Sequence, residues 1–116
     1  MKITDIKGFA ELSNGVKMPY LGLGVYQVND GKEVINAVNF ALEAGYRHID
    51  TASLYDNESG VGKAVRESAI SRSEIFVTSK VWNSDQGYDS TLRAFEKSLR
   101  LMGFDYLDLY LSLIHI

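Results

Sequence analysis

Hydrophobic residues form two kinds of pattern along this chain, continuous runs and helical repeats, and the two kinds alternate. Four short apolar runs have the composition of buried strands: 20–28, 46–52, 75–81 and 106–111. Between them, three stretches repeat apolar residues every three or four positions, as a helix with one buried face does: 34–42, 61–65 and 92–102. The pattern therefore predicts three strand–helix units followed by a fourth strand.

A short antiparallel hairpin is expected before these units. The dipeptide Asn14-Gly15 lies between two apolar segments, 9–12 and 16–18. Such a dipeptide favours a two-residue turn in which both positions have positive φ. Pro19 follows and has no N–H to donate to a ladder, so the ribbon is expected to end there.

The predicted helices have recognisable ends. Asp30 and Glu33 have the spacing of a capping box, and Asn57 suits the N-cap of the second helix. Gly45 and Gly103 follow the first and third helices, as C-terminal glycines do. We expect the apolar stripe within 92–102 to be core. We expect three acidic residues to be solvated surface charges: Glu58, Glu67 and Glu74.

Strands that alternate with helices indicate an α/β fold with a parallel sheet and right-handed crossovers. Two architectures satisfy this order, an open doubly wound sheet and a closed barrel. In both, ligands bind at the carboxyl ends of the strands, so polar residues placed there are candidates for function. The chain shows no linker and no internal repeat.

Composition narrows the possible functions. The chain has 116 residues, of which 46% are hydrophobic and 23% charged, as is ordinary for one globular domain. Its net charge is −3 and it lacks a basic run, so nucleic acid and anionic membranes are not expected partners. No stretch is long and apolar enough to cross a bilayer, and the N-terminus shows no signal core. The absence of cysteine excludes disulfides and thiolate zinc sites and favours a cytoplasmic location.

The candidate chemistry lies at the ends of two predicted strands. Alternate residues of a strand share a face, so Asp50 and Lys80 are expected to meet at the carboxyl edge, with Tyr55 on the loop after Asp50. A phenol is a poor acid with an ordinary pKa of about 10, and a nearby cation lowers such a pKa. A carboxylate beside the lysine keeps the ammonium charged. The three side chains together suit proton donation to a developing alkoxide.

Each of these residues also has a purely structural interpretation. Asp50 and Lys80 can form a structural ion pair and Tyr55 can be a surface aromatic, so only their coincidence on adjacent strand ends favours catalysis. His48 and Asp50 share a strand face, as two ligands of a barrel hydrolase do, but a catalytic zinc site needs three protein ligands. We therefore expect no metal, and we expect His48 to be a packed or hydrogen-bonded core residue.

The segment 22–24, Gly-Leu-Gly, has only part of a dinucleotide-binding fingerprint. Gln27 stands where the third glycine is required, and no helix begins there. These glycines are more typical of close approach by a ligand or a neighbouring backbone. Tyr26 and Trp82 lie just past strand ends, where they can line a small-substrate pocket or pack as core.

Five segments together resemble the signatures of the aldo-keto reductase superfamily: 14–26, 45–52, 57–65, 76–82 and 105–110. Among them are Gly-Tyr-Arg-His-Ile-Asp-Thr-Ala, Asn-Glu-Ser-Gly-Val-Gly-Lys-Ala-Val and Phe-Val-Thr-Ser-Lys-Val-Trp. The resemblance covers nearly the whole chain. The chain is similar to small bacterial members of that superfamily that reduce glyoxal-like, keto-acid or sugar carbonyls.

The resemblance implies a fold and a reaction. The fold is an eight-stranded TIM barrel whose bottom is plugged by the N-terminal hairpin. Within it, 1–19 form the hairpin and 20–110 form the first three βα units and the fourth strand. The reaction is carbonyl reduction with NADPH, in which Tyr55 donates the proton, Lys80 makes that hydroxyl more acidic, and Asp50 holds Lys80.

The resemblance also implies binding residues. Gly24, Val25 and Tyr26 are expected near the nicotinamide or the substrate, and Asp50 is expected to touch the cofactor ribose. Trp82 is expected to line the substrate pocket with Tyr26. The substrate is a small aldehyde or ketone, and the full-length protein is expected to be a monomer.

The chain departs from the family pattern at its end. A family barrel needs about 250 residues, so this chain is expected to be the N-terminal part of a longer protein. The family places a catalytic histidine where Leu113 stands, and His115 lies about 7 Å further along an extended strand, so the role is not transferred to it. The residues 111–116 match the translation of a sequencing-adapter end, CTG TCT CTT ATA CAC ATC, and we expect them to be non-native.

Two other function classes remain open on the sequence. One is a regulatory, non-catalytic subunit that binds the cofactor with the same fold. The other is the barrel hydrolase that would use His48 and Asp50. We expect the 116-residue chain alone to be inactive and to self-associate through unpaired strand edges and an open apolar face.

Overall fold

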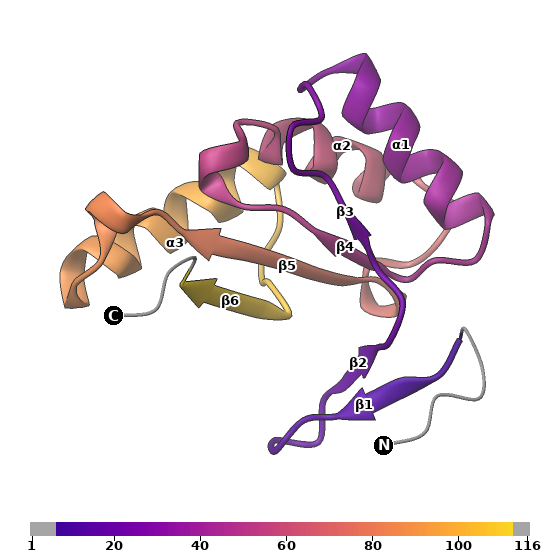
Figure 1. Ribbon diagram of the computed structural model, residues 1–116, viewed down its shortest axis with the longest axis horizontal. Coiled ribbons are helices and arrows are strands. Elements are labelled where there is room, and N and C mark those ends of the chain that lie inside the picture. The colour runs from indigo at the N-terminus through magenta and orange to yellow at the C-terminus, as the bar shows by residue number, and fades with distance from the viewer. Residues whose placement is uncertain (1–6, 113–116) are drawn as a thin grey trace.

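The computed structural model describes residues 7–112. Its centre is a sheet of four parallel strands that follow one another in space as they do in the chain: β3 (Leu23–Gly24), β4 (His48–Asp50), β5 (Phe76–Val81) and β6 (Leu109–Ser112). Three helices connect them: α1 (Lys32–Glu43), α2 (Glu58–Glu67) and α3 (Tyr88–Met102). Figure 1 shows this order from indigo to yellow. The predicted strand–helix alternation is confirmed, although β3, β4 and β6 are shorter than the apolar runs.

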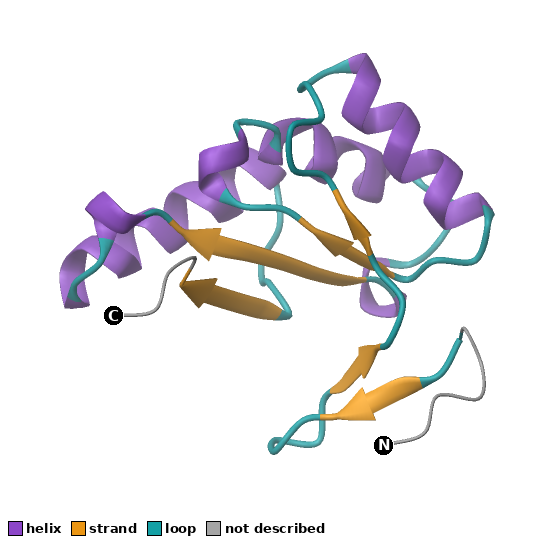
Figure 2. Ribbon diagram, in the orientation of Figure 1, coloured by secondary structure: helices purple, strands orange, loops and turns teal. Residues whose placement is uncertain are grey.

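The three helices lie on one side of the sheet, as Figure 2 shows. Consecutive helices pack against each other, α1 on α2 and α2 on α3. A doubly wound sheet would reverse its strand order and place helices on both faces. The sequential order with helices on one face is that of a barrel wall, so it decides between the two architectures that the sequence left open.

The core fills the space between the helices and this face of the sheet. Ile49 and Val77 point into it from the central strands, and Val34, Val61 and Met102 come from the helices; all five are fully buried. The helices approach closely because α2 carries glycine at the contacts. A Cβ on Gly62 would overlap the backbone of Met102, so only glycine allows α3 to end there.

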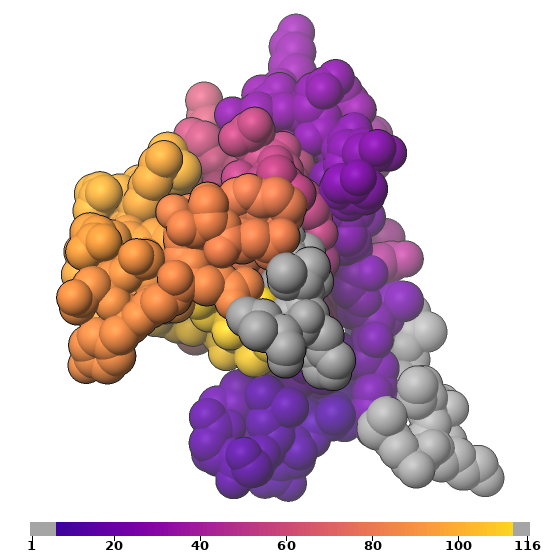
Figure 3. Space-filling model, turned by 60° about the vertical axis from the view of Figure 1, so that its left-hand side comes forward, coloured from indigo at the N-terminus to yellow at the C-terminus, as the bar shows by residue number. Residues whose placement is uncertain are grey.

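The N-terminal hairpin is confirmed, with a different turn. β1 (Phe9–Glu11) pairs antiparallel with β2 (Lys17–Pro19). In the space-filling view of Figure 3 the indigo atoms of this hairpin form a lobe below the rest of the molecule. The Leu12 carbonyl accepts from the Gly15 N–H (2.9 Å), and the Leu12 N–H donates to Val16 (2.8 Å). Within this loop only Gly15 has positive φ, so the loop is a three-residue turn with a glycine bulge rather than the predicted two-residue turn.

Two predicted helix ends are confirmed, Asn57 lies at the predicted N-cap position of α2, and the predicted cap of α1 by Asp30 is wrong. Gly45 and Gly103 have positive φ after α1 and α3. Asp30 does not cap α1, because its carboxylate accepts from the backbone N–H of Gly60 in the first turn of α2 (2.8 Å). Asn57 precedes α2, but its side chain makes no capping bond either. Both polar side chains join distant segments instead of closing their own helix.

Part of the outer surface also differs from the prediction. Leu92, expected in the core stripe of α3, is 51% exposed, so the stripe is buried only toward the other end of the helix, at Ser98 and Met102. Three single-turn 3-10 helices occupy the loops: η1 (Ser53–Tyr55), η2 (Arg72–Glu74) and η3 (Asn83–Asp85). No helix among residues 7–112 is long and apolar enough to cross a membrane.

Candidate active site

Asp50 and Lys80 meet at the carboxyl end of the sheet, as their strand positions predict. Asp50 pairs with Thr78 across β4 and β5, so Lys80 lies two residues further along on the same face. The Lys80 ammonium is 2.8 Å from each carboxylate oxygen of Asp50 and 3.0 Å from the carbonyl of Thr51. The ammonium is therefore held by three acceptor atoms, two on the Asp50 carboxylate and one on the backbone.

Tyr55 lies at the end of η1 and joins this pair. Its hydroxyl is 3.5 Å from the Lys80 nitrogen, which also lies 5.2 Å from the centre of the tyrosine ring. The turn is attached to β5 because the Ser53 hydroxyl donates to the carbonyl of Lys80 (3.1 Å). Acid, amine and phenol thus form one cluster, and their catalytic roles stay a prediction at this point.

Tyr26 extends the cluster from the loop after β3. Its ring is 63% exposed and packs on the ring of Tyr55, with centroids 5.2 Å apart and planes inclined by 51°. Gly24 borders open space, since a Cβ there would meet nothing within 4 Å. Val25, in contrast, is fully buried, and its N–H donates to the carbonyl of Asp50 (3.1 Å). Of the three residues expected near a cofactor, Gly24 and Tyr26 are accessible and Val25 supports them from below.

Trp82 follows β5 directly and is half-buried at the rim of the sheet. It precedes η3 and lies two residues beyond Lys80 in the chain. Its place on the rim is compatible with a pocket wall, and that role stays a prediction.

His48 is partly buried and hydrogen-bonded on the face of β4 opposite the core residue Ile49, so the expected hydrogen bonding is confirmed but a place in the core is not. Nδ1 lies 3.3 Å from the carbonyl of Pro19 and Nε2 lies 2.9 Å from the hydroxyl of Thr78. Because a carbonyl only accepts, Nδ1 carries the proton and Nε2 accepts from Thr78. Burial lowers the pKa of His48 below its ordinary value of 6.5, although the bond to Pro19 and the charge of Asp50 oppose that shift.

Both nitrogens of His48 are therefore engaged, which argues against the metal-binding interpretation. Within residues 7–112, no group of three or more His, Cys, Asp or Glu side chains is placed to hold a metal ion. The His48 ring has room because residue 22 is a glycine. A Cβ on Gly22 would lie 3.0 Å from the Cγ of His48.

The sequence analysis missed two residues that organise this site. Glu58, expected to be a solvated charge, is buried and accepts from the hydroxyl of Ser79 (2.6 Å). Asn57 is fully buried and bonds to the loop after β3 and to Thr51. The sequence did offer a signal, since two polar residues, Asn57 and Glu58, stand in succession just after Tyr55. Local rules assigned the first to a helix cap and the second to the surface.

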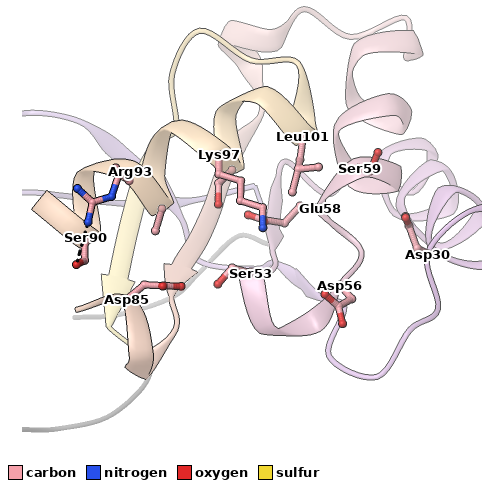
Figure 4. Close-up of a pocket in the computed structure, with 12 residues that line it drawn as sticks. Asp30, Ser53, Asp56, Glu58, Ser59, Asp85, Ser90, Arg93, Lys97 and Leu101 are labelled. Carbon is pink, nitrogen blue, oxygen red and sulfur yellow. Dashed lines mark hydrogen bonds between the residues drawn. The ribbon is translucent and has the colours of Figure 1, made fainter. Parts of the chain in front are cut away.

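A cavity of about 410 Å³ is lined by α2, α3 and the loops between strands and helices, and none of Asp50, Tyr55 and Lys80 lines it. Figure 4 shows the side chains of Glu58 and Lys97 pointing toward each other, with Ser53 and Asp56 below them. Most of its lining side chains are exposed, and the one buried carboxylate among them, that of Glu58, already accepts from Ser79. The cluster itself lies on the open face of the sheet, for which the described residues supply one wall.

Comparison with known proteins settles the family. The model of the aldo/keto reductase family matches residues 20–115. This chain belongs to the aldo/keto reductase family. Its membership confirms the resemblance carried by the five sequence segments.

Two curated relatives show how similar the chain is to characterised members. It is 62% identical over 100 residues to the 9,11-endoperoxide prostaglandin H2 reductase of Trypanosoma cruzi, covering 86% of this chain and 35% of that protein. It is 56% identical over 108 residues to the glyoxal reductase of Bacillus subtilis, covering 93% of this chain and 39% of that protein. The chain thus spans well under half the length of these relatives.

Solved structures confirm the fold. An aldo/keto reductase from Brucella melitensis superposes with a TM-score of 0.86 at 56% identity, covering 90% of this chain and 40% of that one. An aldo-keto reductase of Bombyx mori in complex with NADP superposes with a TM-score of 0.82 at 36% identity, covering 94% and 38%. The hairpin and the parallel βα units therefore correspond to the N-terminal part of the family's barrel, as predicted.

The end of the chain lies partly outside the described residues. Leu111 and Ser112 continue β6 beside Lys80 and Val81. Leu113 and His115, which bear on the catalytic histidine, lie outside the described residues, as does most of the segment expected to be non-native.

Proposed function

We propose that the full-length protein containing this chain is an NADPH-dependent reductase that converts small aldehydes and ketones to alcohols. The observation that supports it is the single cluster formed by Asp50, Lys80 and Tyr55 at the carboxyl end of the barrel wall. Similarity to a glyoxal reductase supports a small carbonyl substrate. We also propose that it acts as a cytoplasmic monomer, a location that its lack of cysteine favours.

The chain's own residues supply the proton and the charge stabilisation. Bound NADPH supplies the hydride that reduces the carbonyl carbon. Tyr55 donates its hydroxyl proton to the carbonyl oxygen, which gains negative charge as the hydride arrives. Lys80, 3.5 Å from that hydroxyl, stabilises the negative charge that Tyr55 acquires, and Asp50 keeps the ammonium in place.

The accessible residues fit the nicotinamide end of the cofactor. Open space borders Gly24, and a partly exposed carboxylate, Asp50, faces the same mouth as the exposed ring of Tyr26. A ribose hydroxyl can donate to such a carboxylate, and a flat aromatic surface suits a nicotinamide or a planar carbonyl group. Trp82 on the rim would border the substrate. The preference for NADPH over NADH is part of the proposal.

The experiment is carbonyl reduction by the full-length protein with Tyr55→Phe. The substitution removes only the proton-donating hydroxyl, so kcat for glyoxal should fall by about 10²–10⁴. The fluorescence titration of NADPH should stay unchanged. Tyr88→Phe is the matched control, because Tyr88 is exposed at the start of α3 and should keep full activity.

Two results would contradict the proposal in different ways. A Tyr55→Phe protein with normal turnover would remove Tyr55 from the reaction. A wild-type full-length protein that binds NADPH but reduces no small aldehyde or ketone would favour the non-catalytic, cofactor-binding alternative.

A further inference from the structure

We propose that Asn57 is a positioning residue that holds Tyr55 and Tyr26 in one fixed arrangement. The inference rests on the proposed function, since it assigns a role for the same reaction. Asn57 touches neither the ammonium of Lys80 nor the hydroxyl of Tyr55 in any described contact. It acts through the two loops that carry the aromatic rings.

The Asn57 side chain is fully buried and fully committed as a donor. Its amide nitrogen donates to the carbonyls of Val25 and Val28, both at 2.9 Å. Its amide oxygen accepts from the hydroxyl of Thr51 at 2.6 Å. One amide therefore joins three chain segments: the loop after β3, the end of β4 and the start of α2.

The first of these segments holds Tyr26. Val25 and Val28 enclose a four-residue turn in which the Val28 N–H donates to the Val25 carbonyl (3.1 Å). Gln27, at the third position, has φ of 63°, a region that a glutamine rarely adopts. Such a conformation persists only where the surroundings enforce it. The two donors of Asn57 reach the carbonyls on either side of Tyr26 and Gln27, so they hold this turn closed.

The second segment holds the acid and contacts the amine. Thr51 follows Asp50, and its carbonyl accepts from the Lys80 ammonium (3.0 Å). Its hydroxyl binds Asn57. The amide is thus connected through one residue to the ion pair beside Tyr55.

The third segment, the start of α2, directly follows the turn that holds Tyr55. Asn57 lies two residues beyond Tyr55, and Asp56 between them has φ of 55°. Other bonds attach this segment to β5, namely Ser53 to the Lys80 carbonyl and Ser79 to Glu58. Asn57 bonds by its side chain to the turn of Tyr26, and the only other hydrogen bond between α2 and the loop after β3 among residues 7–112, from the Gly60 N–H to Asp30, lies beyond that turn.

The consequence is a fixed contact between two rings. The Tyr26 and Tyr55 rings touch at 5.2 Å between centroids although Tyr26 is mostly exposed. Without the amide donors, the turn of Tyr26 is free to open, and Tyr55 loses the ring that limits its position. A displacement of about 1 Å at a reacting group can cost about a hundredfold in rate.

The test is Asn57→Asp in the full-length protein. Aspartate has nearly the same shape but no N–H donors, so both bonds to the loop are lost. We expect kcat for glyoxal to fall by about tenfold to a hundredfold. The KM for NADPH should change little, and the deuterium isotope effect on kcat with deuterated NADPH should rise, because the chemical step becomes more rate-limiting. Asn39→Asp makes the same chemical change at an exposed position of α1 and is the control.

A second pair of variants guards against misfolding. Thr51→Val removes the hydroxyl that binds the amide oxygen and should lower kcat in the same way, by less than Asn57→Asp does. Thr51→Ser restores a hydroxyl and should recover most of that loss. Activity that falls only in proportion to the folded fraction, with an unchanged isotope effect, would overturn the proposal.

A crystal structure of the Asn57→Asp protein separates this inference from the proposed function. If the wild-type protein reduces no carbonyl, the proposed function fails while the contact of the rings still decides the inference. Rings that move apart in the variant support the positioning role. Rings that keep their wild-type contact show that Asn57 does not set their arrangement.

Discussion

Two pairs of opposite charges join neighbouring strands at opposite ends of the same sheet. Arg72 and Asp108 meet at 3.0 Å before β5 and β6, and Lys80 and Asp50 meet at 2.8 Å at the carboxyl ends of β5 and β4. Both bases are largely covered, with side chains 19% and 12% exposed. The acids differ, since Asp108 is 17% exposed and Asp50 is 35% exposed.

The pair before the strands is committed to backbone. The Arg72 guanidinium donates to the carbonyls of Ile75 (2.6 Å) and Tyr106 (3.0 Å) and lies against two aromatic rings. Asp108 also accepts from the N–H of Val77 (2.8 Å). The bonds of Arg72 and Asp108 together therefore join the start of β5 to the chain segment that leads into β6.

The pair at the carboxyl end keeps a side that faces the open mouth. Lys80 approaches a phenol hydroxyl, and the carboxylate of Asp50 is partly accessible. At one end the two charges contact only backbone and rings; at the other they lie beside a proton-bearing group and open space, as the proposed reaction requires. The third partner, rather than the ion pair itself, is what distinguishes the proposed site.

The largest test of this contrast is Lys80→Met in the full-length protein. Loss of the cation removes charge stabilisation beside Tyr55, so kcat for glyoxal should fall by about a hundredfold or more. Stability to urea should fall by less than in Arg72→Met, because Asp50 can use its exposed side to bind water. Normal turnover in this variant would make the two ion pairs equivalent.

Arg72→Met should show the opposite profile. It leaves Asp108 short of its charged partner in a mostly covered position and removes two bonds to carbonyls. We expect a loss of about 2 kcal/mol in the free energy of unfolding, measured by urea denaturation. The kcat per folded molecule should stay unchanged, and a large drop in kcat would contradict the structural assignment.

The smallest effect concerns His48. Burial lowers its pKa by more than the bond to Pro19 and the charges of Asp50 and Asp108 raise it. The folded pKa lies below the unfolded value of about 6.5, so unfolding takes up a proton below that pH. The resulting stability is present above pH of about 6.5 and is lost as pH falls toward the folded pKa. His48→Gln should flatten the slope of unfolding free energy against pH in this window. An unchanged slope would show that His48 does not titrate differently on unfolding.

Local sequence patterns determined the elements and which candidate side chains share a strand face. Alternation along a strand fixes which side chains share a face, so Asp50 and Lys80 were predictable once their strands were neighbours. Gly45 and Gly103 ended their helices because a single residue sets the backbone conformation required there. These features depend on each residue's own backbone and immediate neighbours.

Only the tertiary structure decided the strand order and the partners of the buried polar residues. Asp30 and Asn57 satisfy every local rule for helix caps, yet they bond to segments about thirty residues away, and Glu58 lies buried beside Ser79. The physical reason is that a polar side chain bonds to whichever group packing brings near it once water is excluded. The sequence by itself specifies the donor or acceptor, and the arrangement of helices on one face of the sheet specifies its partner.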